Sequence, residues 1–155
     1  MKKIFAVSMG LLSFNTWAAA VILTCPAPNQ LKKDPQTQVW FAGRNLKNAD
    51  FKSYDLSFAK RVQSFVGAQW QGENVGTMTC VYQPANKYTF SVILSFGHLV
   101  KEPTQGLWGA NQGGYRNCAA LPGKSLTLAD CAFVPMMKNS QTDMYQQLEN
   151  MKGSQ

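Results

Sequence analysis

Apolar and polar side chains alternate most regularly between residues 77 and 96. In residues 88–96 every second position is apolar, and these positions are Tyr88, Phe90, Val92, Leu94 and Phe96. In residues 77–82 the same spacing selects Met78, Cys80 and Tyr82. A period of two is typical of a half-buried strand. Because turn formers occupy residues 83–86, residues 77–96 predict a β-hairpin.

Shorter patterns predict further strands on both sides of this hairpin. Residues 62–70 are extended in character, and residues 71–74 form a plausible turn into Val75, which predicts a second hairpin. Residues 39–42 and 131–134 read as short strands, the latter stopped by Pro135. Residues 50–65 are undecided between helix and strand, since their apolar positions also fit helical spacing: Phe51, Tyr54, Phe58, Val62 and Phe65.

The C-terminal tail has a helical pattern. Met144, Leu148 and Met151 fall on one side of residues 142–151, which predicts a short helix that needs a surface to dock on. Residues 138–155 are therefore expected to be a helical or mobile tail. The whole pattern predicts one mainly β domain over residues 21–155, a small antiparallel β-sandwich or barrel-like fold with a short C-terminal helix.

The first 20 residues have the layout of a secretory signal peptide. Lys2 and Lys3 precede an apolar run over residues 4–12, and three alanines end at Ala20. The run is shorter than the roughly 20 apolar residues of a membrane-spanning helix. We expect cleavage after Ala20 and export. A retained anchor, or a lipid on Cys25, is the alternative. For the exported chain we expect at most peripheral membrane association.

The charge of the chain adds little to this picture. Of 15 Lys and Arg residues, the loss of Lys2 and Lys3 leaves 13 against 8 Asp and Glu. These charges are scattered, and no basic run resembles a nucleic-acid arm. We expect no nucleic-acid partner, and the sequence leaves the oligomeric state open.

Four cysteines remain after cleavage at Ala20: Cys25, Cys80, Cys118 and Cys131. An even number in an exported chain favours two disulfides. Pro122 and Gly123 can fold the intervening loop back, which favours a bond between Cys118 and Cys131. A bond between Cys25 and Cys80 would then pin the N-terminal segment onto the hairpin. The spacing suits neither a zinc site nor a C-x-x-C redox motif, so we expect no metal and no cofactor.

Catalytic signatures are weak. His98 is the only histidine, and it follows a predicted strand in a position typical of a surface turn. A cysteine nucleophile with His98 as base would need a free thiol, which the even cysteine count disfavours. Glu73 and Glu102 could serve as a glycosidase pair, but nothing in the sequence supports it. We therefore expect no enzymatic activity, with a small hydrolase or inhibitor that depends on His98 as an alternative.

Aromatic residues offer one candidate binding site. The glycine-rich stretch 106–115 lacks the ending of a phosphate-binding loop and reads as a flexible loop. It carries Trp108 and Tyr115, which could hold a sugar or another ligand, together with Trp40 and Trp70 if all four formed a platform. Aromatic residues of a small β domain more often belong to the core. A secreted ligand-binding module is thus the alternative function.

The spacing of several residues resembles the DUF3757 group of small exported bacterial proteins. The resemblance covers nearly the whole exported chain and rests on Cys25-Pro26-x-Pro28, Trp40, residues 65–72, Cys80-Val81-Tyr82, Trp108, Cys118 and residues 130–133. It implies a periplasmic accessory protein, without a reaction of its own, that supports effector export by a type IVB (Dot/Icm) secretion apparatus and growth inside a host cell. It assigns no functional residues beyond the four cysteines.

Overall fold

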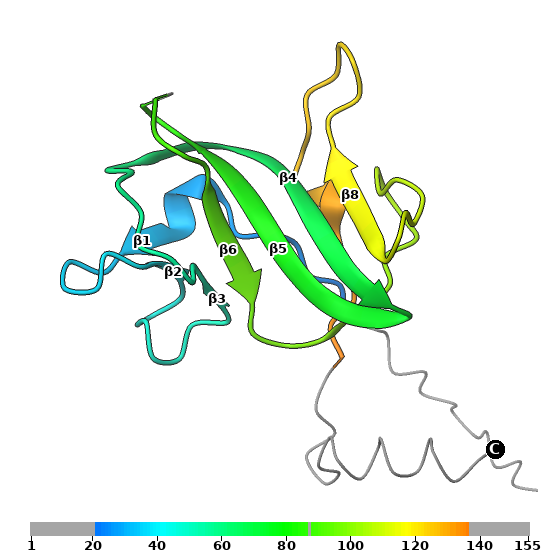
Figure 1. The fold of residues 1–155 in the computed structure, drawn as a ribbon, viewed down its shortest axis with the longest axis horizontal. Coiled ribbons are helices and arrows are strands. Elements are labelled where there is room, and N and C mark those ends of the chain that lie inside the picture. The colour runs from blue at the N-terminus through cyan, green and yellow to red at the C-terminus, as the bar shows by residue number, and fades with distance from the viewer. Residues whose placement is uncertain (1–20, 87, 137–155) are drawn as a thin grey trace, which may run out of the picture.

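The computed structural model describes residues 21–86 and 88–136, which form one antiparallel β-sheet (Figure 1). The predicted signal peptide and the predicted helix over residues 142–151 lie outside the described residues. The elements in chain order are η1 (Pro28–Gln30), β1 (Leu31–Lys33), β2 (Trp40–Ala42), β3 (Phe51–Lys52), β4 (Val62–Glu73), β5 (Val75–Pro84), β6 (Val92–Phe96), β7 (Val100–Lys101), β8 (Tyr115–Ala119) and η2 (Ala129–Cys131).

The strands are ordered β1-β2-β3-β6-β5-β4-β8, and β7 pairs with β5 outside this order. Every pairing is antiparallel. The prediction of a mainly β, antiparallel domain is therefore confirmed. Its finer form, a sandwich or barrel-like arrangement, stays a prediction.

The long β4–β5 hairpin confirms the second predicted hairpin. Its reversal is tight, with Asn74 in the left-handed region at φ 59° and Gly72 paired with Gly76. The two strands approach so closely there that a Cβ on Gly72 would lie 2.4 Å from the carbonyl oxygen of Val75. Only glycine fits such an approach.

The β5–β6 hairpin confirms the first prediction in its core positions but not at its tip. Val92, Leu94 and Phe96 are buried, whereas Tyr88 is 87% and Phe90 is 93% exposed. The alternation in the sequence extends beyond β6 to Tyr88 and Phe90, but the chain there follows a turn at Asn86 and not a strand. Its side-chain oxygen accepts a hydrogen bond from the Tyr88 amide, and its carbonyl accepts one from the Thr89 amide. Such an Asx turn replaces strand pairing locally.

Residues 50–65 contain two strand segments joined by irregular chain. Ser53 diverts the chain after β3, because its hydroxyl accepts a hydrogen bond from the Trp40 amide at 3.0 Å and its own amide donates to the Trp40 carbonyl at 2.8 Å. The predicted strand over residues 39–42 is confirmed as β2. The predicted strand over residues 131–134 is wrong. After η2 the chain makes only single bridges, from Phe133 to Leu23 and from Pro135 to Val100.

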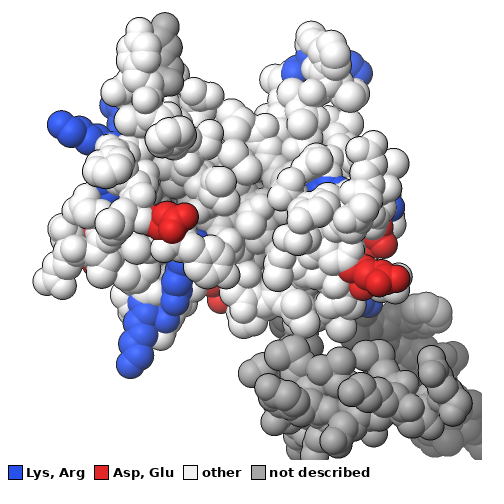
Figure 2. All heavy atoms as spheres, viewed as in Figure 1, with Lys and Arg blue, Asp and Glu red and all other residues white. Residues whose placement is uncertain are grey.

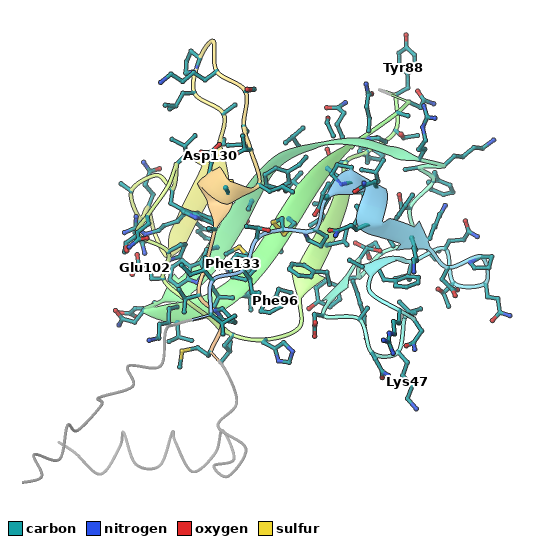
Figure 3. All side chains as sticks on the ribbon, turned by 180° about the vertical axis from the view of Figure 1, so that it is seen from behind. Lys47, Tyr88, Phe96, Glu102, Asp130 and Phe133 are labelled. Carbon is teal, nitrogen blue, oxygen red and sulfur yellow. A yellow bond between two sulfur atoms is a disulfide. The ribbon has the colours of Figure 1, made fainter. Side chains whose placement is uncertain are left out.

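The core lies between one face of the sheet and the two terminal segments of the described chain, residues 21–30 and 128–136 (Figure 3). Phe133 packs against Phe51 and Phe96, with ring centroids 6.4 and 5.4 Å away. Tyr82 is fully buried and donates its hydroxyl to the Pro26 carbonyl at 2.8 Å. Burial raises the pKa of Tyr82 well above its usual value, so it remains a neutral donor.

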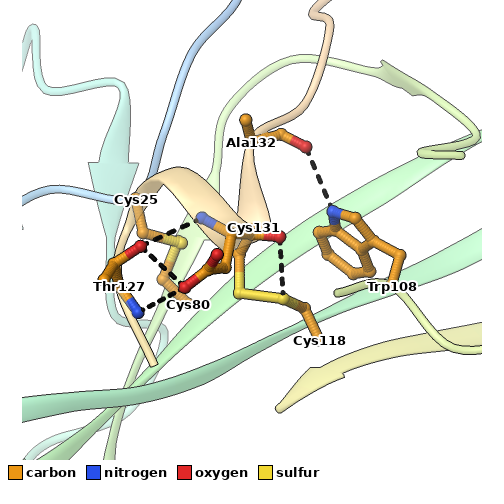
Figure 4. Close-up of a disulfide and its surroundings, with 8 residues drawn as sticks. Cys25, Cys80, Trp108, Cys118, Thr127, Cys131 and Ala132 are labelled. Carbon is orange, nitrogen blue, oxygen red and sulfur yellow. Dashed lines mark hydrogen bonds between the residues drawn. A yellow bond between two sulfur atoms is a disulfide. The ribbon is translucent and has the colours of Figure 1, made fainter. Parts of the chain in front are cut away.

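Two disulfides fasten these segments to the sheet (Figure 4). Cys25 is bonded to Cys80 in β5, and Cys131 is bonded to Cys118 in β8, with Cα atoms 5.8 and 5.7 Å apart. Both predicted pairings are confirmed, and none of the cysteines within the described residues is free.

We predict that the longer crosslink contributes more to stability. Closing a chain loop of 55 residues is worth about 4 kcal/mol and one of 13 residues about 3 kcal/mol in the chain-entropy estimate. Urea unfolding of the Cys25→Ala/Cys80→Ala and Cys118→Ala/Cys131→Ala variants checks this order. A larger loss in the second variant would contradict it.

Candidate interaction surface

The candidate reactive residues, which are the four cysteines and His98, all make structural contacts. All four cysteines are bonded in pairs, so none is available as a nucleophile. His98 lies on the surface, as predicted. Its Nε2 is 3.3 Å from Oδ1 of Asp50, and its ring packs on Phe96 with centroids 5.3 Å apart. In the described part of the chain, the Asp50 carboxylate is the polar side chain that contacts the His98 imidazole.

The four aromatic residues do not form one platform. Trp40 and Trp70 are buried in the core, which confirms the core interpretation for them. Trp108 is half-buried against the core and donates its indole N–H to the Ala132 carbonyl at 3.1 Å (Figure 4). Tyr115 is exposed at the start of β8, and its hydroxyl accepts a hydrogen bond from Gln71 Nε2 at 2.8 Å. Trp108 thus anchors its loop, whereas Tyr115 faces solvent.

An ion pair holds the glycine-rich loop on the sheet. Glu102 Oε1 accepts hydrogen bonds from Arg116 Nε at 2.6 Å and from Asn111 Nδ2 at 2.9 Å. Arg116 also donates to the Gly109 carbonyl at 2.7 Å. The hydrogen bonds from Asn111 and Arg116 hold the pKa of the Glu102 carboxyl below its ordinary value of 4.5. Glu102 therefore positions the loop through its hydrogen bonds to Asn111 and Arg116.

A shallow cavity of about 620 Å³ lies beside this loop. It is lined by Gln71, Glu73, Asn111 and Tyr115, together with glycines 72, 113 and 114. The lining offers one aromatic ring and several hydrogen-bonding side chains. Such a combination suits a polar ligand.

Among residues 21–86 and 88–136, no segment covers the face of the sheet opposite the terminal segments, and this face carries little charge. Along β4, β5, β6 and β8, the positions that alternate with buried ones include one charged residue, Glu73 at the end of β4. The others are uncharged: Gln69, Gln71, Thr77, Thr79, Val81, Gln83, Ile93, Ser95, Tyr115, Asn117 and Ala119. In Figure 2 the acidic and basic side chains lie mainly toward the margins of this face. A hydrogen bond of 2.9 Å from Gln69 to Asn117 fastens β4 to β8 across it. We call these positions the open face.

A second surface lies at the outer edge of β6. Two segments, residues 53–58 and 88–93, enclose a groove of about 520 Å³. Six of its lining side chains are large, apolar and more than half exposed: Tyr54, Leu56, Phe58, Tyr88, Phe90 and Ile93. Tyr88 projects from the tip of its loop (Figure 3). We call this surface the aromatic groove.

Sequence reasoning missed the aromatic groove because it assigned these side chains to the faces of regular elements. The available signal was the turn chemistry around them. Asn86 precedes Tyr88, and Ser53, Asp55 and Ser57 interrupt the other segment. Exposed apolar clusters of this kind mark interaction sites.

Two other site classes find no support in the described residues. Residues 21–86 and 88–136 hold no group of three or more His, Cys, Asp or Glu side chains that could bind a metal ion. Over the same ranges, no helix has the length and apolar character needed to traverse a bilayer.

Comparisons with protein-family models, with curated proteins and with solved structures find no match to this chain. The class of protein that fold and surface define is a disulfide-bonded antiparallel β domain with one covered and one open sheet face.

We predict that Glu102→Gln lowers the free energy of unfolding at pH 7, and that this loss shrinks as the pH falls below 4.5. The folded-state pKa of Glu102 is lowered, so its stabilisation is present above the ordinary pKa and disappears as the carboxyl is protonated. Urea unfolding at pH 7 and at pH 3 measures the difference. Glu73→Gln, at an exposed position, serves as the control, and its loss at pH 7 should be smaller than that of Glu102→Gln. A loss that is the same at both pH values would contradict the role given to Glu102.

Proposed function

We propose that this protein is a non-enzymatic, periplasmic accessory protein that supports effector export by a type IVB secretion apparatus through contacts with other proteins. Two disulfides support residence in an oxidising compartment outside the cytoplasm. The resemblance to the DUF3757 group, and within it to EirA, a periplasmic protein associated with the Dot/Icm machine, supports the secretion role. We place residues 1–20 in a cleaved signal peptide.

The low charge of the open face is the observation that best supports a binding role. Val81 and Ile93 lie on it among uncharged polar side chains, close to Val66. The centres of protein interfaces are depleted in charged residues, whereas the exposed surface of a monomer is usually rich in them. A sheet face whose alternating positions are uncharged, except for Glu73 at the end of β4, is therefore suited to contact with another protein.

The finer architecture belongs to this proposal. The terminal segments bridge to each other at Leu23 and Phe133, and the C-terminal segment bridges to β7 at Val100 and Pro135. These bridges support a barrel-like closure in which the core is enclosed on one side of the sheet and the open face lies outside it.

A deletion strain of the source bacterium tests the proposal. We expect effector translocation to fail without the gene and to be restored by the wild-type chain. Val81→Lys should fold normally but restore translocation about tenfold less well or worse, since an unpaired ammonium group desolvated in an interface costs roughly 3 kcal/mol. Gln36→Lys, which adds the same charge at the exposed turn between β1 and β2, is the matched control.

Normal translocation in the deletion strain would contradict the secretion role. Full restoration by Val81→Lys, at equal protein level, would instead show that the open face is not the contact surface.

A carbohydrate- or ligand-binding module is the second candidate, favoured by the cavity beside Tyr115 and Asn111. Under this alternative, a glycan array should show binding by the wild type and by Tyr115→Phe, and none by Tyr115→Ala, because the ring and not the hydroxyl stacks on a sugar. Trp108→Ala removes the other candidate residue. An array without any bound glycan would leave this alternative unsupported.

A further inference from the structure

The outer edge of β6 is only partly paired. β3 pairs with Ser95 and Phe96 and then leaves β6 at Ser53. The amide of Gly97 donates to the Asp50 carbonyl at 2.7 Å, so odd-numbered residues of β6 direct their N–H and C=O groups toward the β3 side. The N–H and C=O of Ile93 therefore point into the space that β3 vacates. Within residues 21–86 and 88–136 no backbone hydrogen bond reaches them.

This unpaired edge forms part of the wall of the aromatic groove. Tyr54, Leu56 and Phe58 line the side opposite β6, and Phe90 and Ile93 line the side of β6. A volume of about 520 Å³ falls in the range of about 300–1,000 Å³ typical of ligand pockets. A free strand edge beside apolar side-chain pockets is the arrangement by which proteins bind an extended peptide as an added strand. A helix would leave the peptide groups of Ile93 unpaired.

The charge of the aromatic groove narrows the choice of peptide. Asp55 is the charged residue among those that line it. Neither of the ion pairs in the described part of the chain involves its carboxylate. A basic side chain is complementary to this carboxylate and can also stack on the exposed rings of Tyr54 and Phe58.

We propose that the aromatic groove binds an extended peptide segment of a partner protein, with apolar residues at alternating positions and one Lys or Arg, which pairs with β6 at Ile93 and places its basic side chain at Asp55. This inference does not depend on the secretion role. It adds a binding site at the edge of the sheet, which shares Ile93 with the open face.

Selection of a phage-displayed library of random heptapeptides on the purified wild-type protein tests the proposal. We expect enrichment of peptides with alternating apolar residues and one Lys or Arg. An enriched peptide, labelled with a fluorophore, should bind Asp55→Asn about tenfold more weakly than wild type in fluorescence anisotropy. Phe90→Ser, which removes an exposed wall of the groove, should weaken it similarly.

Ile93→Pro provides the sharpest variant. It deletes one N–H that points away from β5, so the β5–β6 ladder keeps its hydrogen bonds. Binding should weaken about tenfold in Ile93→Pro and stay within about twofold in the control Ile93→Val, which keeps the N–H. If Ile93→Pro does not fold, the same peptide N-methylated at alternate residues tests the backbone pairing on the wild type, with the same expected loss.

Several outcomes would overturn the proposal. They are a selection without enrichment, enriched peptides that are acidic, and equal affinity for Ile93→Pro or for the N-methylated peptide. If Phe90→Ser instead abolishes dimer formation in sedimentation, or binding to phosphatidylglycerol vesicles, while no peptide binds, the occupant is a second copy or a membrane. Because these assays use purified protein, a failure here leaves the secretion role untouched, and normal export in a deletion strain leaves peptide binding untouched.

Discussion

The one-sided covering of the sheet is the constraint on which the rest of this structure depends. Two disulfides hold the terminal segments against the same face, one to β5 through Cys80 and one to β8 through Cys118. The covered face then encloses a core built around Trp70, Met78 and Leu94. A small domain buries a limited fraction of its surface, so crosslinks that restrict the unfolded chain matter more than in a large one.

The surfaces available to partners follow from this arrangement. With both terminal segments of the described chain on one side, no other described segment covers the opposite face, and its alternating positions are uncharged except for Glu73. The departure of β3 at Ser53 leaves the edge of β6 unpaired and exposes the aromatic side chains of the groove. Polar side chains that could take part in chemistry stabilise the fold instead. Glu102 holds a loop through Arg116, and the Tyr82 hydroxyl donates a hydrogen bond to the Pro26 carbonyl. These features favour a role in which the protein binds partners through its surface.

Alternation predicted the paired strands well, because a half-buried strand needs period two wherever a core lies beneath it. The reversals after β4 and β5 were also predicted, although the strands extend into the predicted turns, to Glu73 and Pro84. Both preferred disulfide pairings are present. Tyr88 and Phe90 were misassigned because alternation cannot reveal where the partner strand ends. The aromatic groove combines residues 53–58 with residues 88–93, which are distant in the sequence. It depends on the diversion of the chain at Ser53, where a tertiary hydrogen bond forms that no local pattern encodes. The unpaired backbone groups of Ile93 could likewise be recognised only from the register of the sheet.

Peptide mapping of the unreduced protein, isolated from the source bacterium and alkylated before digestion, tests the covering of the sheet most directly. We expect two crosslinked peptide pairs, one joining Cys25 to Cys80 and one joining Cys118 to Cys131, and no alkylated cysteine. A crosslink between Cys80 and Cys131, or alkylation at any of the four positions, would contradict the arrangement from which both surfaces are inferred.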